Sequence, residues 1–96
     1  MPAYLILDIH VVDSEEYAAY RERSPATLEA HGGRYLVRGG EHEVVEGDWD
    51  PERVVVVEFP SVERAREWYR SPEYQEIAPM RQRAAPSRVV LVQGVE

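Results

Sequence analysis

The 96-residue chain has the length of one domain, and it is acidic, with 18 Asp and Glu against 11 basic side chains and a net charge of −7. This charge disfavours nucleic-acid binding, because phosphate backbones repel an acidic surface. The absence of cysteine excludes disulfides, thiol nucleophiles and thiolate metal sites, and it fits a reducing compartment.

Hydrophobic patterning divides the chain into alternating segments. Runs rich in β-branched residues predict strands, and stretches with helical spacing that follow Asp or Ser predict helices. In chain order we expect a strand over 4–12, a helix from 13 to the glycine pair 32–33, a strand over 34–39, an irregular segment over 40–52, a strand over 53–59, a helical segment after 61, and a strand over 87–93.

The first helix has a clear start and an internal proline. Asp13 and Glu16 have the spacing of a capping box. Pro25 should kink the helix or restart it with Ser24 as a new cap. The inward stripe at helical spacing comprises Tyr17, Tyr20, Ser24 and Leu28.

The second helical segment should consist of two pieces. Ser61 is a suitable N-cap, and Ala65, Trp68 and Tyr69 should face inward. The sequence Ser71-Pro72-Glu73 then combines a cap, a proline in the first turn and an acidic side chain, which predicts a restart that continues to about Arg81 with a distortion at Pro79.

The element order β-α-β-β-α-β predicts an α+β, ferredoxin-like fold. Right-handed crossovers favour a four-stranded sheet in the order 4-1-3-2 with both helical segments on one face. In this arrangement we expect strands one and three to be parallel neighbours, and strand two to run antiparallel to strand three.

The helix-free face of this sheet should be polar in a monomer, but it is half apolar. Its side chains are expected to include Tyr4, Ile6, Asp8 and His10 from the first strand and Val54, Val56 and Glu58 from the third. Such a face covers roughly 300–400 Å², near the largest apolar patch that monomers tolerate. We therefore expect a homodimer; the alternative is a monomer with a mildly apolar face.

Several stretches carry a family resemblance over nearly the whole chain. They are Gly32 through Gly40, Glu46-Gly47-Asp48-Trp49, Arg53 through Ser61, Trp68 through Tyr74 with the preceding Ala65, and the late Arg81. On these the chain resembles domain-of-unknown-function family 1330, within the dimeric α/β-barrel superfamily. The resemblance implies a ferredoxin-like fold and a barrel formed by the sheets of two subunits, and it implies no particular reaction. The wider superfamily includes cofactor-free monooxygenases, isomerases and haem-degrading enzymes.

Asp8, His10 and Glu58 are the candidate catalytic residues. With strands one and three parallel, they should lie on the helix-free face toward one end of the sheet. There they could transfer protons, because two close carboxylates push the pKa of one of them upward. Alternatively they form ion pairs that fix the dimer register. A register that pairs Arg34 with Glu58 sets Arg38 opposite Val54, on the same face at the far end.

Six residues are candidate ligand contacts. Arg38 and Glu46 flank the bend at Gly39-Gly40. Arg38 could clamp the carboxylate of a ligand. Alternatively, it could brace residues 40–52 by bonding their carbonyls or Glu46. Arg81 could meet an anion or pair with Glu58 or Glu76. The aromatic candidates are Trp49, Trp68 and Tyr74; Trp68 and its neighbour Tyr69 have the spacing of core residues, whereas Tyr74 is the better pocket candidate.

The histidines His10, His31 and His42 show no metal-ligand spacing. We therefore expect neither a metal nor a cofactor. His31, next to Gly32, suits a helix C-terminus.

Three functions remain open. The leading hypothesis is a homodimer that binds a small organic molecule, carboxylate-bearing or aromatic, in a pocket between sheet and helices. The alternatives are a cofactor-independent monooxygenase or isomerase and a purely structural protein. Because no basic residue precedes Arg21 and the apolar runs are short and interrupted, we expect a cytoplasmic protein with no membrane partner.

Overall fold

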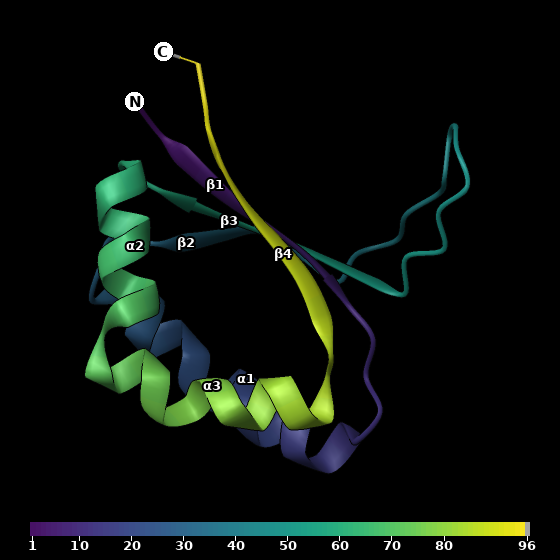
Figure 1. Cartoon of the computed structure of the whole chain (residues 1–96), viewed down its shortest axis with the longest axis horizontal. Helices are drawn as coiled ribbons and strands as arrows, with labels where there is room; N and C mark the ends of the chain where they lie inside the picture. Colours follow the sequence, from purple (N-terminus) through teal and green to yellow (C-terminus); the bar gives the residue numbers. More distant parts are fainter. Residues whose placement is uncertain (96) are drawn as a thin grey trace.

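A computed structural model describes residues 1–95 as one antiparallel four-stranded sheet with helices on one face (Figure 1). The predicted ferredoxin-like order of elements is confirmed, with the second helical segment divided in two. The elements are β1 (Ala3–Ile9), α1 (Ser14–Glu29), β2 (Arg34–Arg38), β3 (Arg53–Phe59), α2 (Val62–Arg70), α3 (Pro72–Ala84) and β4 (Ser87–Gln93). None of the helices in this range is both long and apolar enough to cross a membrane.

The strand order β2-β3-β1-β4 is the predicted order, but the expected parallel pairing of β1 and β3 is wrong. These strands run antiparallel, so Tyr4 lies opposite Glu58 and Asp8 opposite Val54. The helical crossover returns β2 in the direction of β1, and the connection from β2 to β3 has no helix and reverses the chain. Strand β3 is therefore antiparallel to both of its neighbours.

Helix α1 begins as predicted, since the Asp13 side chain accepts a hydrogen bond from the backbone N–H of Glu16 at 3.2 Å. The predicted inward stripe is buried. Pro25 does not restart the helix, which runs unbroken from Ser14 to Glu29. Ser24 is not a cap; its hydroxyl bonds that of Tyr35 at 2.9 Å instead. The tertiary partner therefore overrides the capping preference of this serine.

Serine caps organise the second helical segment. Ser61 caps α2 through the N–H of Arg64, and Ser71 caps α3 through the N–H of Tyr74. Helix α3 includes Pro79 and continues one turn past the predicted end, to Ala84, whose carbonyl accepts hydrogen bonds from the N–H groups of Val12 and Asp13. These bonds tie the end of α3 to the segment between β1 and α1.

The core lies between the helices and one face of the sheet. The buried side chains of that face are Leu5, Leu7, Ile9, Val55, Val57 and Phe59, as the period-two pattern predicts. The helices contribute Tyr17, Tyr20, Leu28, Ala65, Trp68, Tyr74, Ile77, Ala78 and Ala84. Tyr69, expected inside, is 40% exposed. On the outer face, Val90 and Val92 of β4 are 55% and 44% exposed, so an apolar surface is open there.

A β-bulge in β2 turns Arg38 toward the helices. Arg34 lies opposite Glu58, as predicted, but the register shifts between Tyr35 and Val37. As a result, Arg38 pairs with Val55 of the core face rather than with Val54 of the outer face. The extra residue of a bulge inverts the alternation beyond it, which places Arg38 on the face opposite to the expected one.

Residues 40–52, here called the arm, have no regular secondary structure and project from the end of the sheet (Figure 1). Gly39 and Gly47 have φ angles of +75° and +96°, which allow the chain to turn at the base of the arm and near its tip. His42 Nε2 lies 3.0 Å from the carbonyl oxygen of Pro51, and this contact bridges the two sides of the arm.

Candidate functional site

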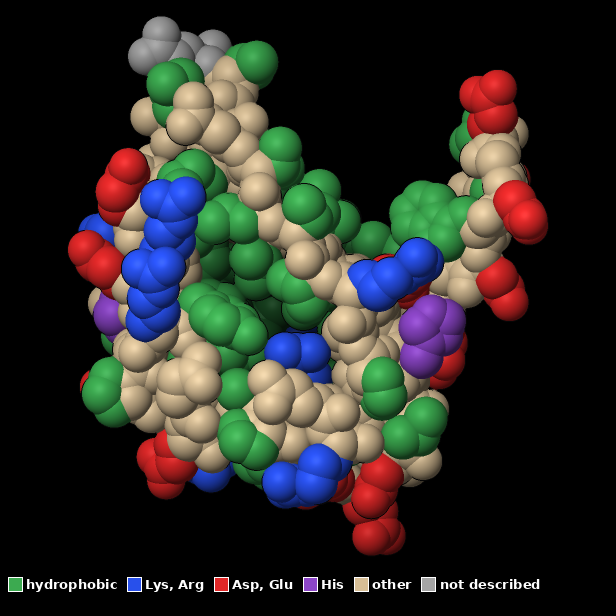
Figure 2. Space-filling model, viewed as in Figure 1, with side chains coloured by type: hydrophobic (Ala, Val, Ile, Leu, Met, Phe, Trp, Pro, Cys, Tyr) green, Lys and Arg blue, Asp and Glu red, His purple; other side chains and the backbone are tan. Residues whose placement is uncertain are grey.

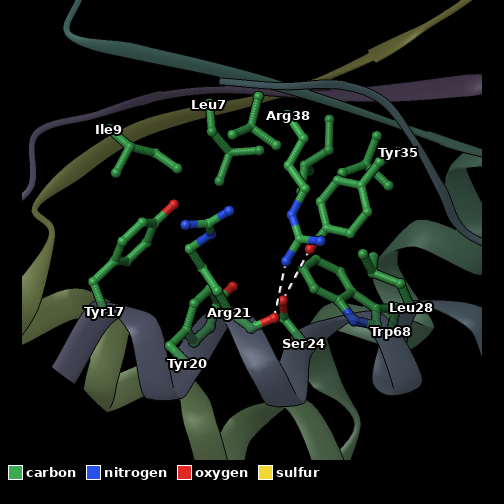
Figure 3. Close-up of a pocket in the computed structure, with 13 residues that line it drawn as sticks. Leu7, Ile9, Tyr17, Tyr20, Arg21, Ser24, Leu28, Tyr35, Arg38 and Trp68 are labelled. Atoms are coloured by element: carbon green, nitrogen blue, oxygen red, sulfur yellow. Dashed lines mark hydrogen bonds between the residues drawn. The ribbon is translucent and has the colours of Figure 1, made fainter. Parts of the chain in front are cut away.

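A narrow cavity lies between α1 and the core face of the sheet (Figure 3). The space left open in it is about 30 Å³, enough for a water molecule or two. Its walls are mostly apolar and aromatic, with two arginines: Leu5, Leu7, Ile9, Tyr17, Tyr20, Arg21, Ser24, Leu28, Tyr35, Arg38, Val55, Val57 and Trp68. No carboxylate or histidine is among these residues.

The two arginines come from opposite walls of the cavity. Figure 3 shows the Arg21 side chain rising from α1 and the Arg38 side chain descending from the sheet. Arg38 Nη2 donates a hydrogen bond to the main-chain carbonyl of Arg21 at 2.9 Å. In an α-helix that carbonyl would accept from the N–H four residues later, but this position is Pro25, which has none. The proline therefore leaves an acceptor that fixes Arg38.

Neither arginine is neutralised within residues 1–95, because neither forms an ion pair with any acidic side chain there. Both are exposed, at the solvent side of a mostly apolar and aromatic cavity. Although the chain has a net charge of −7, this site carries two arginine side chains without an acidic partner in that range. They would attract an anion, which guanidinium groups bind through paired hydrogen bonds.

Contacts among tyrosine, serine and arginine side chains hold the lining of the cavity in position. The Arg38 guanidinium lies 4.4 Å from the Tyr35 ring centroid, within the range of a cation–π contact. The hydroxyls of Tyr35 and Ser24 bond each other, and burial raises the pKa of Tyr35. Across the cavity, the Tyr17 hydroxyl accepts from Arg53 Nε at 3.2 Å. These contacts hold the aromatic rings in place around the open space.

A second hydrogen-bond chain runs from the cavity wall into the protein. The hydroxyls of Tyr20 and Tyr74 are 3.0 Å apart, and Arg81 Nε donates to the Tyr74 hydroxyl at 3.3 Å. All three residues are buried. Burial raises the pKa of Tyr20, so its hydroxyl stays protonated at neutral pH. Arg81 therefore bonds a phenol, while Glu58 and Glu76, its expected partners, pair with Arg34 and Arg23.

The candidate catalytic residues do not enter this cavity. Asp8 and His10 lie at one end of the outer face, with 3.2 Å between His10 Nε2 and Asp8 Oδ1. The other ring nitrogen of His10 lies 3.4 Å from Glu52. Asp8 also accepts hydrogen bonds from Arg88 at 3.0 Å and Trp49 at 3.2 Å. Burial raises the pKa of Asp8, but these bonds and the nearby His10 outweigh it, so the net pKa is lowered.

Glu58 lies at the opposite end of the outer face, because β1 and β3 are antiparallel. It pairs with Arg34 at 2.8 Å. The expected convergence of Asp8, His10 and Glu58 at one end of the sheet is therefore wrong. Both nitrogens of His10 already face carboxylates, which leaves it poorly placed as a free base. Within residues 1–95 no group of three or more acidic or histidine side chains is arranged to hold a metal ion.

The predicted ligand contacts divide among three places. Arg38 and Trp68 line the cavity, with Trp68 Nε1 bonded to Thr27 at 3.0 Å. Tyr74 and Arg81 lie behind the wall, in the Tyr20 chain. Glu46 and Trp49 belong to the arm, and Trp49 contacts the outer face. Arg38 does not bond Glu46; its own carbonyl accepts from Arg53 Nη2 at 3.2 Å, so Arg53 braces the base of the arm.

Sequence reasoning missed Arg21 as a site residue. It lies one position from the predicted inward Tyr20, at the edge of the buried stripe. Its position four residues before Pro25 could have indicated it, because a proline inside a helix leaves the carbonyl four residues earlier without its helical hydrogen bond. That carbonyl then needs a partner, and a donor on a neighbouring element can supply one.

Comparison with known proteins identifies the family. A family model described as "Domain of unknown function (DUF1330)" matches residues 2–95. The chain belongs to this family. No curated protein matches the sequence. The family description assigns no function, so the site must be interpreted from its own geometry.

Solved structures share the fold. One is the protein of unknown function RPA0582 from Rhodopseudomonas palustris, at 27% identity and a TM-score of 0.79, covering 99% of this chain and 83% of that one. Another is SnoaB, a cofactor-independent oxygenase from Streptomyces nogalater, at 12% identity and a TM-score of 0.67, covering 99% and 94%. A putative antibiotic biosynthesis monooxygenase from Nitrosomonas europaea matches at 14% identity and a TM-score of 0.57, covering 98% and 90%.

Proposed function

We propose that this protein is a homodimer that binds a small organic anion with an apolar or aromatic body in the cavity between α1 and the sheet. The observation that carries the proposal is the pair of unneutralised arginines, Arg21 and Arg38, at the solvent side of an aromatic-lined cavity. The guanidinium groups would hold the anionic group, and the rings of Tyr17, Tyr35 and Trp68 would surround the body.

The ligand would enlarge the cavity as it enters. The open space of about 30 Å³ is smaller than a bound aromatic ring requires. Arg21 is exposed and makes no ion pair within residues 1–95, so its long side chain can rotate outward at little cost. Arg38 is held by the Arg21 carbonyl and would remain as the fixed cation. Arg21 would then close over the ligand after entry.

Dimerisation is supported by the outer face of the sheet. No helix covers this face, and Val90 and Val92 are about half exposed. Ile6, Val54 and Val56 lie on the same face and are only partly buried. Packing two such faces about a twofold axis would remove this apolar surface from water, which stabilises association.

A cofactor-independent monooxygenase or isomerase is the second candidate. The fold shared with SnoaB permits it, and the Tyr20 hydroxyl at the cavity wall, bonded to Tyr74 and backed by Arg81, offers a hydrogen-bonding group to a reacting atom. Against it, no carboxylate or histidine among residues 1–95 lines the cavity, so these residues supply no conventional general base in its walls. Turnover of a bound aromatic acid without added cofactor, followed by mass spectrometry, would favour this candidate. A purely structural protein would bind no ligand at all.

The proposed function is tested with two matched probes, 2-naphthoate and 2-naphthalenemethanol. They share a ring system and differ in charge. We expect the anion to raise the melting temperature and to bind more tightly by calorimetry, and we expect Arg21→Met/Arg38→Met to abolish this preference, since Met keeps the apolar stem. Equal binding of both probes by the wild-type protein would contradict the role of the arginines.

A further inference from the structure

A second concave surface lies between α2 and β4; it shares Leu5 with the arginine cavity but includes neither Arg21 nor Arg38. Figure 2 shows it as a hollow lined with hydrophobic side chains, with basic side chains on the side formed by α2. It has a volume of about 260 Å³ and is lined by Leu5, Ala65, Arg66, Tyr69, Arg70, Val89 and Leu91. This surface is here called the α2–β4 hollow.

Arg66 and Arg70 carry free charges on the rim of the α2–β4 hollow. They are four residues apart on α2, where like charges face each other and repel. Within residues 1–95 neither forms an ion pair or a side-chain hydrogen bond, whereas Arg64 on the same helix lies 3.7 Å from Glu67. The hollow thus combines an apolar floor with two cations that lack a counter-charge.

The arm has the complementary composition. Of the chain's 18 acidic residues, six lie in the arm, namely Glu41, Glu43, Glu46, Asp48, Asp50 and Glu52. Val44 and Val45 of the arm are 40% and 89% exposed. An acidic segment that displays two valines is complementary in charge and polarity to an apolar surface ringed by arginines.

We infer that the arm of one protomer docks in the α2–β4 hollow of a second copy of this chain. The arm does not occupy the hollow of its own chain: no residue of 40–52 lines that hollow, and Figure 1 shows the arm and α2 on opposite sides of the molecule. Residues 43–46 would dock in an extended conformation, in which alternate residues face opposite ways. Val44 and Glu46 then share one face and Glu43 and Val45 the other, so either face presents a valine to the floor and a glutamate to the rim arginines.

The inference rests on the proposed homodimer and adds a specific contact to it. Each protomer has one arm and one hollow, so a twofold dimer satisfies both pairs at once. The partner's arm would close the mouth of the hollow. A site completed by two chains would follow, with Arg66 and Arg70 from one and Glu43 or Glu46 from the other.

Cysteine cross-linking tests the contact directly, because the natural chain contains no cysteine. Val45→Cys and Val89→Cys are purified separately, mixed and oxidised. We expect a disulfide-linked heterodimer to form at least about tenfold faster than with Glu22→Cys in place of Val89→Cys, because docking raises the effective thiol concentration. Glu22 is exposed on α1 and forms no ion pair within residues 1–95. Equal rates with both partners would overturn the inference.

A charge exchange provides the second test. Glu43→Arg/Glu46→Arg and Arg66→Glu/Arg70→Glu should each raise the dimer Kd by about tenfold, measured by sedimentation at low salt, and the fourfold variant should restore it. Glu22→Arg/Glu29→Arg makes the same change in net charge as Glu43→Arg/Glu46→Arg and should leave Kd unchanged. If the protein forms a dimer whose Kd is unchanged by all these substitutions, and no cross-link forms, the arm contact is contradicted but the proposed dimer is not. A protein that never self-associates would contradict both this inference and the proposed dimer.

Discussion

The Arg38 guanidinium donates a 2.9 Å hydrogen bond to the main-chain carbonyl of Arg21. Pro25 frees this carbonyl from the helical hydrogen-bond ladder, and a bulge in β2 turns Arg38 toward it. The contact fixes Arg38 without a carboxylate, so its positive charge remains available to a ligand. Two local irregularities in the backbone thus create one charged position in the cavity.

Replacing Arg38 with Met should separate binding from stability. The side chain is exposed and its hydrogen bond is to one carbonyl, so the free energy of unfolding should fall by less than about 1 kcal/mol. The affinity for 2-naphthoate should fall by about 2–4 kcal/mol, as expected for a lost charge-assisted pair. Calorimetry and thermal melting measure the two effects.

Arg23→Met is the matched control for Arg38→Met. Arg23 lies on α1, exposed, and pairs with Glu76 at 3.4 Å away from the cavity. It should leave 2-naphthoate affinity unchanged. If Arg38→Met instead caused a large loss of stability with early proteolysis near Gly47-Asp48, Arg38 would be a structural brace for the arm rather than a ligand contact.

The side of the sheet on which Arg38 lies could not be predicted from the sequence pattern. Alternation correctly predicted the core face of β1 and β3, because Leu5, Leu7, Val55 and Val57 recur with a period of two. The same counting along β2 placed Arg38 on the outer face. A bulge is set by local backbone pairing with the neighbouring strand, and Tyr35-Leu36-Val37 contains no glycine to signal it.

The two tyrosines of the buried chain should differ in their contribution to stability. Tyr74→Phe leaves Arg81 Nε without its hydroxyl partner, so we expect a loss of about 2–3 kcal/mol in the free energy of unfolding. Tyr20→Phe removes only one neutral hydrogen bond and should cost about 1 kcal/mol. Urea denaturation of both variants measures the difference. Equal losses would mean that Arg81 finds another acceptor.

The sequence indicated Tyr74 and Arg81 as ligand contacts, yet they lie in the interior. Arginine is rarely buried and tyrosine is intermediate, so residue type alone does not predict that both are inside. They can be buried because Arg81 and the Tyr74 hydroxyl are hydrogen-bonded to each other, and the Tyr74 hydroxyl also bonds that of Tyr20. Such mutual satisfaction depends on how α1 and α3 pack together, which no local pattern encodes.

Asp8→Asn tests the outer-face cluster through pH. The pKa of Asp8 is lowered in the folded state, so its ionised form contributes stability at pH values above its unfolded pKa of about 3.9. That contribution is lost as the pH falls through the folded pKa. The variant should therefore be less stable by about 1–2 kcal/mol near neutral pH, with the difference shrinking toward about pH 3. A difference that stayed constant with pH would contradict the charged contacts to Arg88 and Trp49.

Val56→Asp should dissociate the proposed dimer without unfolding the subunit. Val56 is partly buried on the outer face, so a carboxylate stays hydrated in the monomer but becomes desolvated between two sheets. Sedimentation at roughly 10–100 µM should show a dimer for the wild-type protein and a monomer for the variant. Val12→Asp, at a position 71% exposed outside the sheet, is the control. A Val56→Asp dimer of unchanged Kd would place the interface elsewhere.

The location of a bound anion is the most direct test of the proposed cavity. We would record intermolecular nuclear Overhauser effects between 2-naphthoate and protein with labelled methyl groups. We expect effects at the methyls of Leu7 and Val55, which line the cavity beside Arg38, and their loss in Arg21→Met/Arg38→Met. Effects confined to Val90 and Val92 on the outer face, or none at saturating probe, would contradict it.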